Sequence, residues 1–235
     1  EVKILICNDN GSIQKECDTD EVGEVCVVNP GVTLHGTYTD SNKNKGLYPD
    51  ERFMRTGDLG RIDKDGYLWL TGRAKDLIIR GGHNIDPSLI EDAIAGHEDV
   101  AVVGAIGQPD PKSGEVPCAY VQLVNGGKAT SEDILEFTNK VVGEQAARPK
   151  YVEILPELPL TNVGKIFKPE LRKMAIKRVL NAHLKSKGIS ASVETVRDDK
   201  NLGLVASING GQEEKDKVAK VLGSYSVPWE FKDLV

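Results

Sequence analysis

The sequence feature that most constrains the fold is a pair of long apolar runs near the middle of the chain. They span Val100–Ile106 and Val116–Val124 and contain no charged residue. Continuous apolar runs of this length are typical of well-buried strands, because a strand with one face in water would alternate apolar and polar residues. The segment between them, residues 108–114, is rich in Pro, Gly and Asp. We therefore expect two buried strands joined by a loop at 108–114.

Helix-start signals lie on both sides of these runs. Asp86 followed by Pro87 predicts a helix N-terminus, with Asp as the cap and Pro in the first turn. Thr130 with Asp133 matches a capping box at the start of a second helix. The side chains expected on one face of each helix are Leu89, Ile90, Ala93 and Ile94 in the first and Ile134, Thr138, Val141 and Val142 in the second.

The pattern of elements predicts an α+β protein in three parts. Residues 1–72 are β-rich, with short strands at Val2–Cys7 and Glu24–Val28 and a hairpin turn at 63–66. Residues 73–187 form a small α+β domain that includes the apolar runs and a strand at 151–155. Residues 188–235 form an appended βαβ-like lobe, with elements in the order strand (190–196), strand (202–208), helix (213–222) and strand (224–231).

A basic helix is predicted over Pro169–Lys187. Its charged residues are Arg172, Lys173, Lys177, Arg178, Lys185 and Lys187, opposed only by Glu170. Charge runs on helices are usually solvated faces, and the alternative is electrostatic attraction of an anionic cofactor.

Composition excludes several classes of function. The 235 residues include 30 Lys and Arg against 36 Asp and Glu, a net charge of −6, which argues against nucleic-acid binding. No apolar run approaches the roughly 18 residues of a transmembrane segment, and we expect Glu1–Ile4 to be the start of a strand and not of a secretory leader. Because the first residue is not Met, we expect the chain to be a fragment of a longer protein.

The cysteines show no metal-binding or catalytic spacing. Cys7, Cys17, Cys26 and Cys118 form no CxxC pair and lie far from the histidines in sequence. We expect them to be reduced, structural residues of a cytoplasmic protein, and we expect no metal site.

Three polar motifs contain glycines and are not required by core packing. In the first, Arg55–Asp58, a carboxylate fixed at a turn suits hydrogen bonds from two vicinal hydroxyls, although an ordinary Asx turn has the same pattern. In the second, Gly72–Asp76, alternating charges at a domain boundary suit a hinge. It leads to Gly81 and Gly82, which allow a ligand close to the backbone or simply form a hairpin turn.

The third motif, Pro159–Lys168, contains Lys165 directly after Gly164. A lysine in such a loop can project as a point charge onto phosphate or carboxylate oxygens, whereas an isolated one is usually just exposed. A contact at about 4 Å, with an effective dielectric near 20, is worth roughly 4 kcal/mol before desolvation.

In their order and spacing these motifs resemble the adenylate-forming acyl-CoA synthetase superfamily, over about residues 20–175. The segment Gly23–Cys26, with Gly31 and residues 36–38 (Gly-Thr-Tyr), resembles the Gly-Glu segment of that family. Arg55–Asp58 resembles the ribose motif, Gly72–Ile85 the hinge and thioester motif, and Leu158–Lys168 the catalytic-lysine loop. His83 departs from the pattern, since many relatives have an acidic residue there.

The resemblance implies a fold and a reaction. Residues 1–72 would be the end of a large N-terminal domain and part of a distorted barrel, followed by a mobile C-terminal domain. The reaction would join a small-molecule carboxylic acid, of the fatty-acid type, to ATP as an acyl-adenylate and then transfer it to CoA. Mg²⁺ would be bound mainly by the missing N-terminal domain, so the fragment alone would be inactive.

The resemblance also implies residue roles. Asp58 and Arg73 would bind the ribose of ATP or AMP, Lys75 would be the hinge, and the backbone at Gly81 and Gly82 would admit the pantetheine arm of CoA. Lys165 would bridge the acyl carboxylate and the α-phosphate. Two alternatives remain open: an adenylation domain that loads a carrier protein, and a non-enzymatic binding or assembly module in which Lys165 is dispensable.

Overall fold

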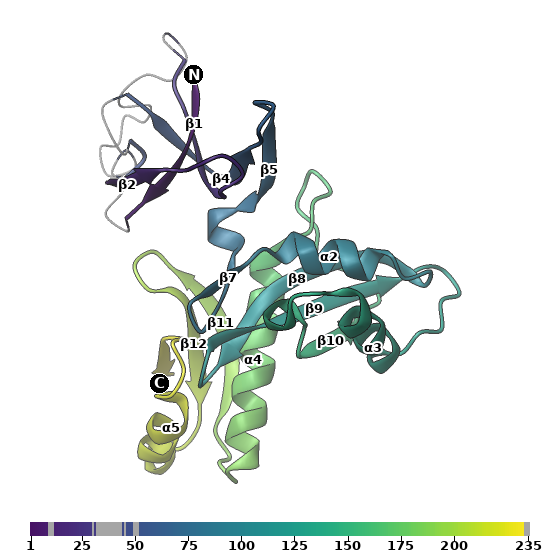
Figure 1. The fold of residues 1–235 in the computed structure, drawn as a ribbon. Helices are drawn as coiled ribbons and strands as arrows, with labels where there is room; N and C mark the ends of the chain where they lie inside the picture. The colour runs from purple at the N-terminus through teal and green to yellow at the C-terminus, as the bar shows by residue number, and fades with distance from the viewer. Residues whose placement is uncertain (9–11, 30, 32–43, 45, 49–51, 233–235) are drawn as a thin grey trace. The chain divides into compact units, whose positions relative to one another are not determined.

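A computed structural model describes residues 1–8, 12–29, 31, 44, 46–48 and 52–232 of the chain (Figure 1). The chain divides into two compact units, Glu1–Leu77 and Ile78–Val235. The Gly-Thr-Tyr segment at 36–38, part of the family resemblance, lies outside the described residues.

The first unit contains an open, antiparallel five-stranded sheet in the order β2-β1-β3-β4-β5. Its strands are β1 (Val2–Cys7), β2 (Ile13–Glu16), β3 (Gly23–Val27), β4 (Met54–Ile62) and β5 (Leu68–Arg73). The predicted strands and the hairpin turn at 63–66 are confirmed. Strand β2 has no counterpart among the predictions because all four of its residues are exposed and it lacks the alternating pattern of a half-buried strand.

The second unit is built on the two apolar runs. They form β8 (Val100–Asp110) and β9 (Gly114–Leu123), which pair antiparallel along their whole length. Strand β10 (Tyr151–Ile154) lies parallel to β9. Strands β6 (Ile78–Arg80) and β7 (His83–Ile85) form a hairpin, and β6 pairs with β9 at Gly114.

The predicted loop at 108–114 is wrong in extent. Strand β8 continues to Asp110 and β9 begins at Gly114, so Pro109 lies in the ladder opposite Glu115. Hydrogen bonding between the strands extends past the apolar core, and polar composition therefore misplaces the boundary.

Helices cover both faces of this sheet. Alternate residues of β9, Ala119 and Val121, share a core with α2 (Pro87–Ala95) and α3 (Ser131–Val141). The residues that precede each of these, Cys118 and Tyr120, point to the other face and share a core with α4 (Lys168–Ser186). This arrangement explains why both runs are continuously apolar.

The predicted helix starts are confirmed, and the predicted faces are wrong at one position each. Asp86 accepts a hydrogen bond from Ser88 N, and Thr130 forms the capping box with Asp133. However, Leu89 is 53% exposed and Val141 is 50% exposed. Each precedes a buried residue by one position, about 100° around the helix axis, and so points away from the core.

The last part of the chain packs against the far side of α4 (Figure 1). It contains β11 (Ser192–Asp199), β12 (Gly203–Asn209), α5 (Lys215–Leu222) and β13 (Trp229–Phe231). Strands β12 and β13 are parallel and connected through α5, as a βαβ-like lobe requires, and the predicted order of elements is confirmed. None of the helices in the described residues is long and apolar enough to cross a bilayer.

Candidate functional site

Asp58 and Arg73, the two predicted ribose-binding residues, are neighbours across β4 and β5. Their Cα atoms are in register, and Arg73 Nε lies 3.1 Å from Asp58 Oδ1. The Arg73 side chain remains 52% exposed and the Asp58 side chain 36% exposed, so a ligand can reach the carboxylate. The structure thus brings together one acceptor and one cation at the solvent-facing end of a strand pair.

The predicted turn at Arg55–Asp58 is wrong: Asp58 lies within β4, where the pairing with β3 shifts register in a β-bulge, and a buried carboxylate fixes this bulge. Glu24, on β3, is only 8% exposed and forms an ion pair with Arg55 at 2.6 Å. Its Oε1 accepts a hydrogen bond from Gly57 N at 3.1 Å. The bond with Glu24 also raises the pKa of Arg55. Glu24 therefore holds Arg55 and Gly57 of the motif in place.

Thr56 also stabilises this bulge. Its hydroxyl donates to the Val25 carbonyl at 2.8 Å and accepts from Asp58 N at 3.1 Å. Glu24 belongs to a segment that resembles the family, but its contact with the bulge next to Asp58 was not predicted. The one available signal was an acidic residue inside an otherwise apolar strand.

Lys75 is exposed and lies in the short 3₁₀ helix η1 (Ala74–Asp76). This helix immediately precedes the division between the two compact units, at Leu77 and Ile78. A predicted hinge residue therefore occupies the segment that connects them.

Gly81 and Gly82 form the two-residue turn between β6 and β7, where Arg80 pairs with His83. Both glycines have positive φ, +57° and +86°, as a type I′ hairpin turn requires. A Cβ at either position would meet no atom within 4 Å, so the backbone here is open to a passing group. Arg80 anchors the hairpin by donating to the Ala146 carbonyl at 2.6 Å.

Lys165 lies in a small, well-defined turn between Leu160 and Ile166, which form an isolated bridge. Thr161 organises it: its N–H donates to the Lys165 carbonyl at 2.7 Å, and its hydroxyl accepts from Lys165 N at 3.1 Å. Gly164 has φ of +77°, which a β-carbon would strain. The Lys165 side chain is exposed, and no described acidic residue lies within ion-pair distance of its amine.

The base of this loop is fixed by a different lysine. Lys168 Nζ lies 2.9 Å from Glu91 Oε1, and both side chains are largely buried. The same Glu91 oxygen accepts from Ala105 N at 2.8 Å, which ties α2, β8 and the start of α4 together. Sequence reasoning missed Glu91, because only the tertiary fold brings it to Lys168.

Two cations of the basic helix are already neutralised within the fold. Lys173 pairs with Asp198 at 2.8 Å, and this hydrogen bond raises the pKa of Lys173. Arg178 stacks on the Tyr151 ring at 3.5 Å and donates to Gln108 at 2.7 Å. For these two residues the helix charge serves packing between α4 and its neighbours.

The described residues contain no cluster of three or more His, Cys, Asp or Glu side chains that could hold a metal ion. The described residues alone therefore do not provide a site that fits Mg²⁺. The four cysteines are free thiols, and burial raises the pKa of Cys118 to about 12.

Comparison with known proteins places these features in a family. Residues 89–165 match the model of the AMP-binding enzyme C-terminal domain. The marinolic acid–CoA ligase of Pseudoalteromonas sp. (strain SANK 73390) is 40% identical over 225 residues, which are 94% of this chain and 34% of that protein. A match of this extent necessarily includes most of the appended lobe.

Two further relatives agree. The 2-succinylbenzoate–CoA ligase of Bacillus cereus (strain Q1) is 38% identical over 65% of this chain and 31% of its own length. The structure of ATP-bound MatB from Rhodopseudomonas palustris superimposes with a TM-score of 0.66 and 30% identity, over 73% of this chain and 33% of that one. The chain spans about a third of the length of these proteins. It belongs to the adenylate-forming acyl-CoA synthetase superfamily and contains that family's AMP-binding C-terminal domain.

Proposed function

We propose that this chain is the C-terminal portion of an AMP-forming carboxylate–CoA ligase. The observation that carries the proposal is the presentation of Lys165. Its amine is exposed on the residue that closes a hydrogen-bonded turn and has no acidic partner among the described residues, while the nearby Lys168 is ion-paired. A lysine held in this way is available to neutralise the oxygens of a ligand that comes from outside the unit.

In the first half-reaction the acid carboxylate attacks the α-phosphate of ATP, which forms the acyl-adenylate and releases pyrophosphate. Lys165 donates hydrogen bonds to the carboxylate and α-phosphate oxygens, whose mutual repulsion opposes the attack. Asp58 accepts hydrogen bonds from the ribose hydroxyls, and Arg73, at 3.1 Å, holds that carboxylate in position. The protein's work is positioning and charge neutralisation, with no covalent intermediate on the chain.

In the second half-reaction the thiol of CoA attacks the acyl carbonyl and AMP leaves. The open turn at Gly81 and Gly82 gives the pantetheine arm a side-chain-free path. The large N-terminal domain supplies the rest of the nucleotide site, the acid pocket and the Mg²⁺ ligands, so the 235 residues alone do not adenylate.

The test uses the complete protein that contains these residues and measures the two half-reactions separately. Lys165→Ala should slow adenylation, measured by acid-dependent pyrophosphate exchange, by about 10²–10³-fold, the typical cost of one preorganised donor. Thioester formation from supplied acyl-adenylate should remain near the wild-type rate. Lys168→Ala removes the ion-paired lysine at the base of this loop and is the control for a loss of stability. The thermal unfolding of both variants is compared.

An equal loss in both half-reactions would contradict the role of Lys165. Unchanged adenylation in Lys165→Ala would show that Lys165 is dispensable, and absence of adenylation by the complete wild-type protein would favour a non-enzymatic module. Thioester formation with a phosphopantetheinyl carrier protein, and none with free CoA, would identify the acceptor as a protein.

A further inference from the structure

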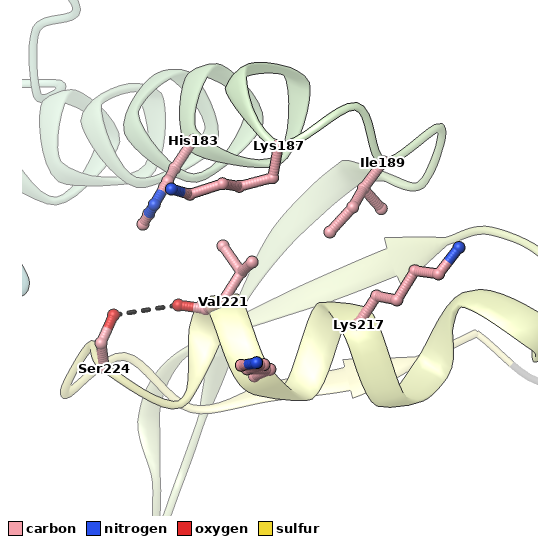
Figure 2. Close-up of a pocket in the computed structure, with 7 residues that line it drawn as sticks. His183, Lys187, Ile189, Lys217, Val221 and Ser224 are labelled. Carbon is pink, nitrogen blue, oxygen red and sulfur yellow. Dashed lines mark hydrogen bonds between the residues drawn. The ribbon is translucent and has the colours of Figure 1, made fainter.

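A second charged feature of the chain has no part in the proposed reaction. A cavity of about 470 Å³ lies between the C-terminal end of α4 and α5 (Figure 2). Its lining comprises His183, Lys187, Ile189, Lys217, Lys220, Val221 and Ser224. This volume lies within the range of small-molecule sites, about 300–1,000 Å³.

The helix period explains why these side chains gather. His183 and Lys187 are four residues apart at the end of α4, and Lys217, Lys220 and Val221 follow the i, i+3, i+4 spacing on α5. Each helix therefore turns one cation-bearing face toward the cavity. Other residues of the two helices, Leu180 and Leu184 of α4 and Val218 and Leu222 of α5, belong to the apolar core of the lobe.

The charge at this cavity is not neutralised by the fold. Lys187, Lys217 and Lys220 are exposed and form no ion pair with any residue that the structure describes. Other cations of the same region are paired: Lys173 with Asp198, Arg197 with Glu230 and Lys232 with Glu194. Three lysines around one hollow, in a chain whose net charge is −6, are the arrangement that attracts an anion.

The cavity also has apolar and hydrogen-bonding parts. Ile189 is buried and Val221 half-buried, so together they give it an apolar wall. His183 Nδ1 lies 2.9 Å from the Tyr225 hydroxyl, and its other nitrogen has no hydrogen-bond partner among the described residues. When the tyrosine hydroxyl donates to Nδ1, the second nitrogen carries a proton and is a donor.

We propose that this cavity binds a phosphate monoester that carries a short apolar body. A phosphate dianion has enough oxygens to accept from several ammonium groups and the imidazole at once, whereas a single carboxylate has two. The apolar body would lie against Ile189 and Val221. The ligand comes either from solution or from a lipid headgroup, and the experiment below distinguishes these two sources.

The test measures binding of n-hexyl phosphate to the full chain by isothermal titration calorimetry. We expect saturable binding that is stronger than that of inorganic phosphate, and about tenfold weaker in Lys217→Ala/Lys220→Ala, because two charge contacts are lost. Lys128→Ala/Lys200→Ala removes the same charge from exposed positions outside the cavity and should bind as the wild type does. Lys165→Ala should also bind normally, which separates this cavity from the predicted catalytic loop.

Sedimentation with phosphatidylcholine vesicles, with and without phosphatidic acid, identifies the source. Retention only on vesicles that contain phosphatidic acid, lost in the double variant, would assign a lipid headgroup, and binding of hexyl phosphate without retention would assign a soluble ligand. The proposal is overturned if neither probe binds saturably, or if binding survives Lys217→Ala/Lys220→Ala unchanged.

Discussion

At the scale of single residues, Glu24 determines whether the bulge of β4 next to Asp58 keeps its shape. Glu24→Ala would leave the part-buried Arg55 guanidinium without its ion pair and Gly57 N without its acceptor. An unsatisfied buried donor costs about 1–3 kcal/mol, and loss of a charged partner adds to this, so we expect the first unit to lose about 2–3 kcal/mol of unfolding free energy. Urea unfolding, followed by Trp69 fluorescence in a Trp229→Phe background, measures it.

Glu16→Ala is the matched control for this experiment. Glu16 also pairs with a cation, Lys3 at 2.6 Å, but its side chain is 55% exposed. Exposed pairs of this kind contribute little, so its unfolding midpoint should stay close to that of the wild type. Equal midpoints for Glu24→Ala and Glu16→Ala would show that the buried pair does not stabilise the bulge.

The same scale shows how far sequence reasoning reaches into the candidate site. The three polar motifs taken together, with the family that they resemble, nominate Asp58 and Lys165, although each motif alone is also typical of an ordinary Asx turn or an exposed loop lysine. The residues that hold them in place are not found in this way. Glu24 acts on a backbone N–H 33 positions away, and Glu91 acts on Lys168 of another element, so their roles exist only once the chain is folded.

At the scale of elements, the backbone geometry of the turn between β6 and β7 predicts how a substitution there changes stability. Gly82 has φ of +86° and open space around its Cα, so Gly82→Ala brings backbone strain without a clash. We expect a loss of about 1 kcal/mol in the stability of the second unit. Gly143 also has open space but no positive φ, so Gly143→Ala should be neutral or slightly stabilising.

Urea unfolding followed by Trp229 fluorescence, in a Trp69→Phe background, compares the two alanine variants within one unit. Similar effects of both substitutions would mean that helix or strand propensity, and not the left-handed backbone, governs the result at Gly82.

Element boundaries were predictable where the signal is local. The capping box of Thr130 and the Asp86 cap each involve only a few consecutive residues, and both helices begin where these signals place them. The exposure of Leu89 and Val141 was not predictable, because it depends on which neighbouring residue meets the sheet. The extension of β8 to Asp110 likewise depends on its hydrogen bonds to β9, which the composition of one segment does not encode.

At the scale of the whole molecule, the predicted site residues are divided between two compact units. Asp58, Arg73 and Lys75 belong to the first, whereas Gly81 and Lys165 belong to the second. A reaction that needs both sets, in two successive steps with different partners, requires a connection that can change its backbone angles. Lys75 lies in that connection, within η1. The hypothesis of a hinge there means that the backbone angle φ of Lys75 changes between the two steps.

Lys75→Pro tests this hypothesis in the complete protein, because proline fixes φ near −65° and removes the N–H. If the units reorient about Lys75, one half-reaction should be retained and the other should fall by at least about tenfold, since the locked angle permits one arrangement only. Lys75→Ala removes the charge and leaves the backbone free, so both half-reactions should persist.

Lys64→Pro provides the control for proline itself. Lys64 is the second residue of the turn in which Gly66 N donates to the Asp63 carbonyl at 3.0 Å, a position where proline is favoured. It should leave both half-reactions unchanged. If Lys75→Pro does the same, reorientation does not take place at Lys75, and the residues that flank it in η1 become the next positions to lock. If Lys75→Ala alone abolishes one step, the side chain and not the backbone angle is the element that the reaction needs.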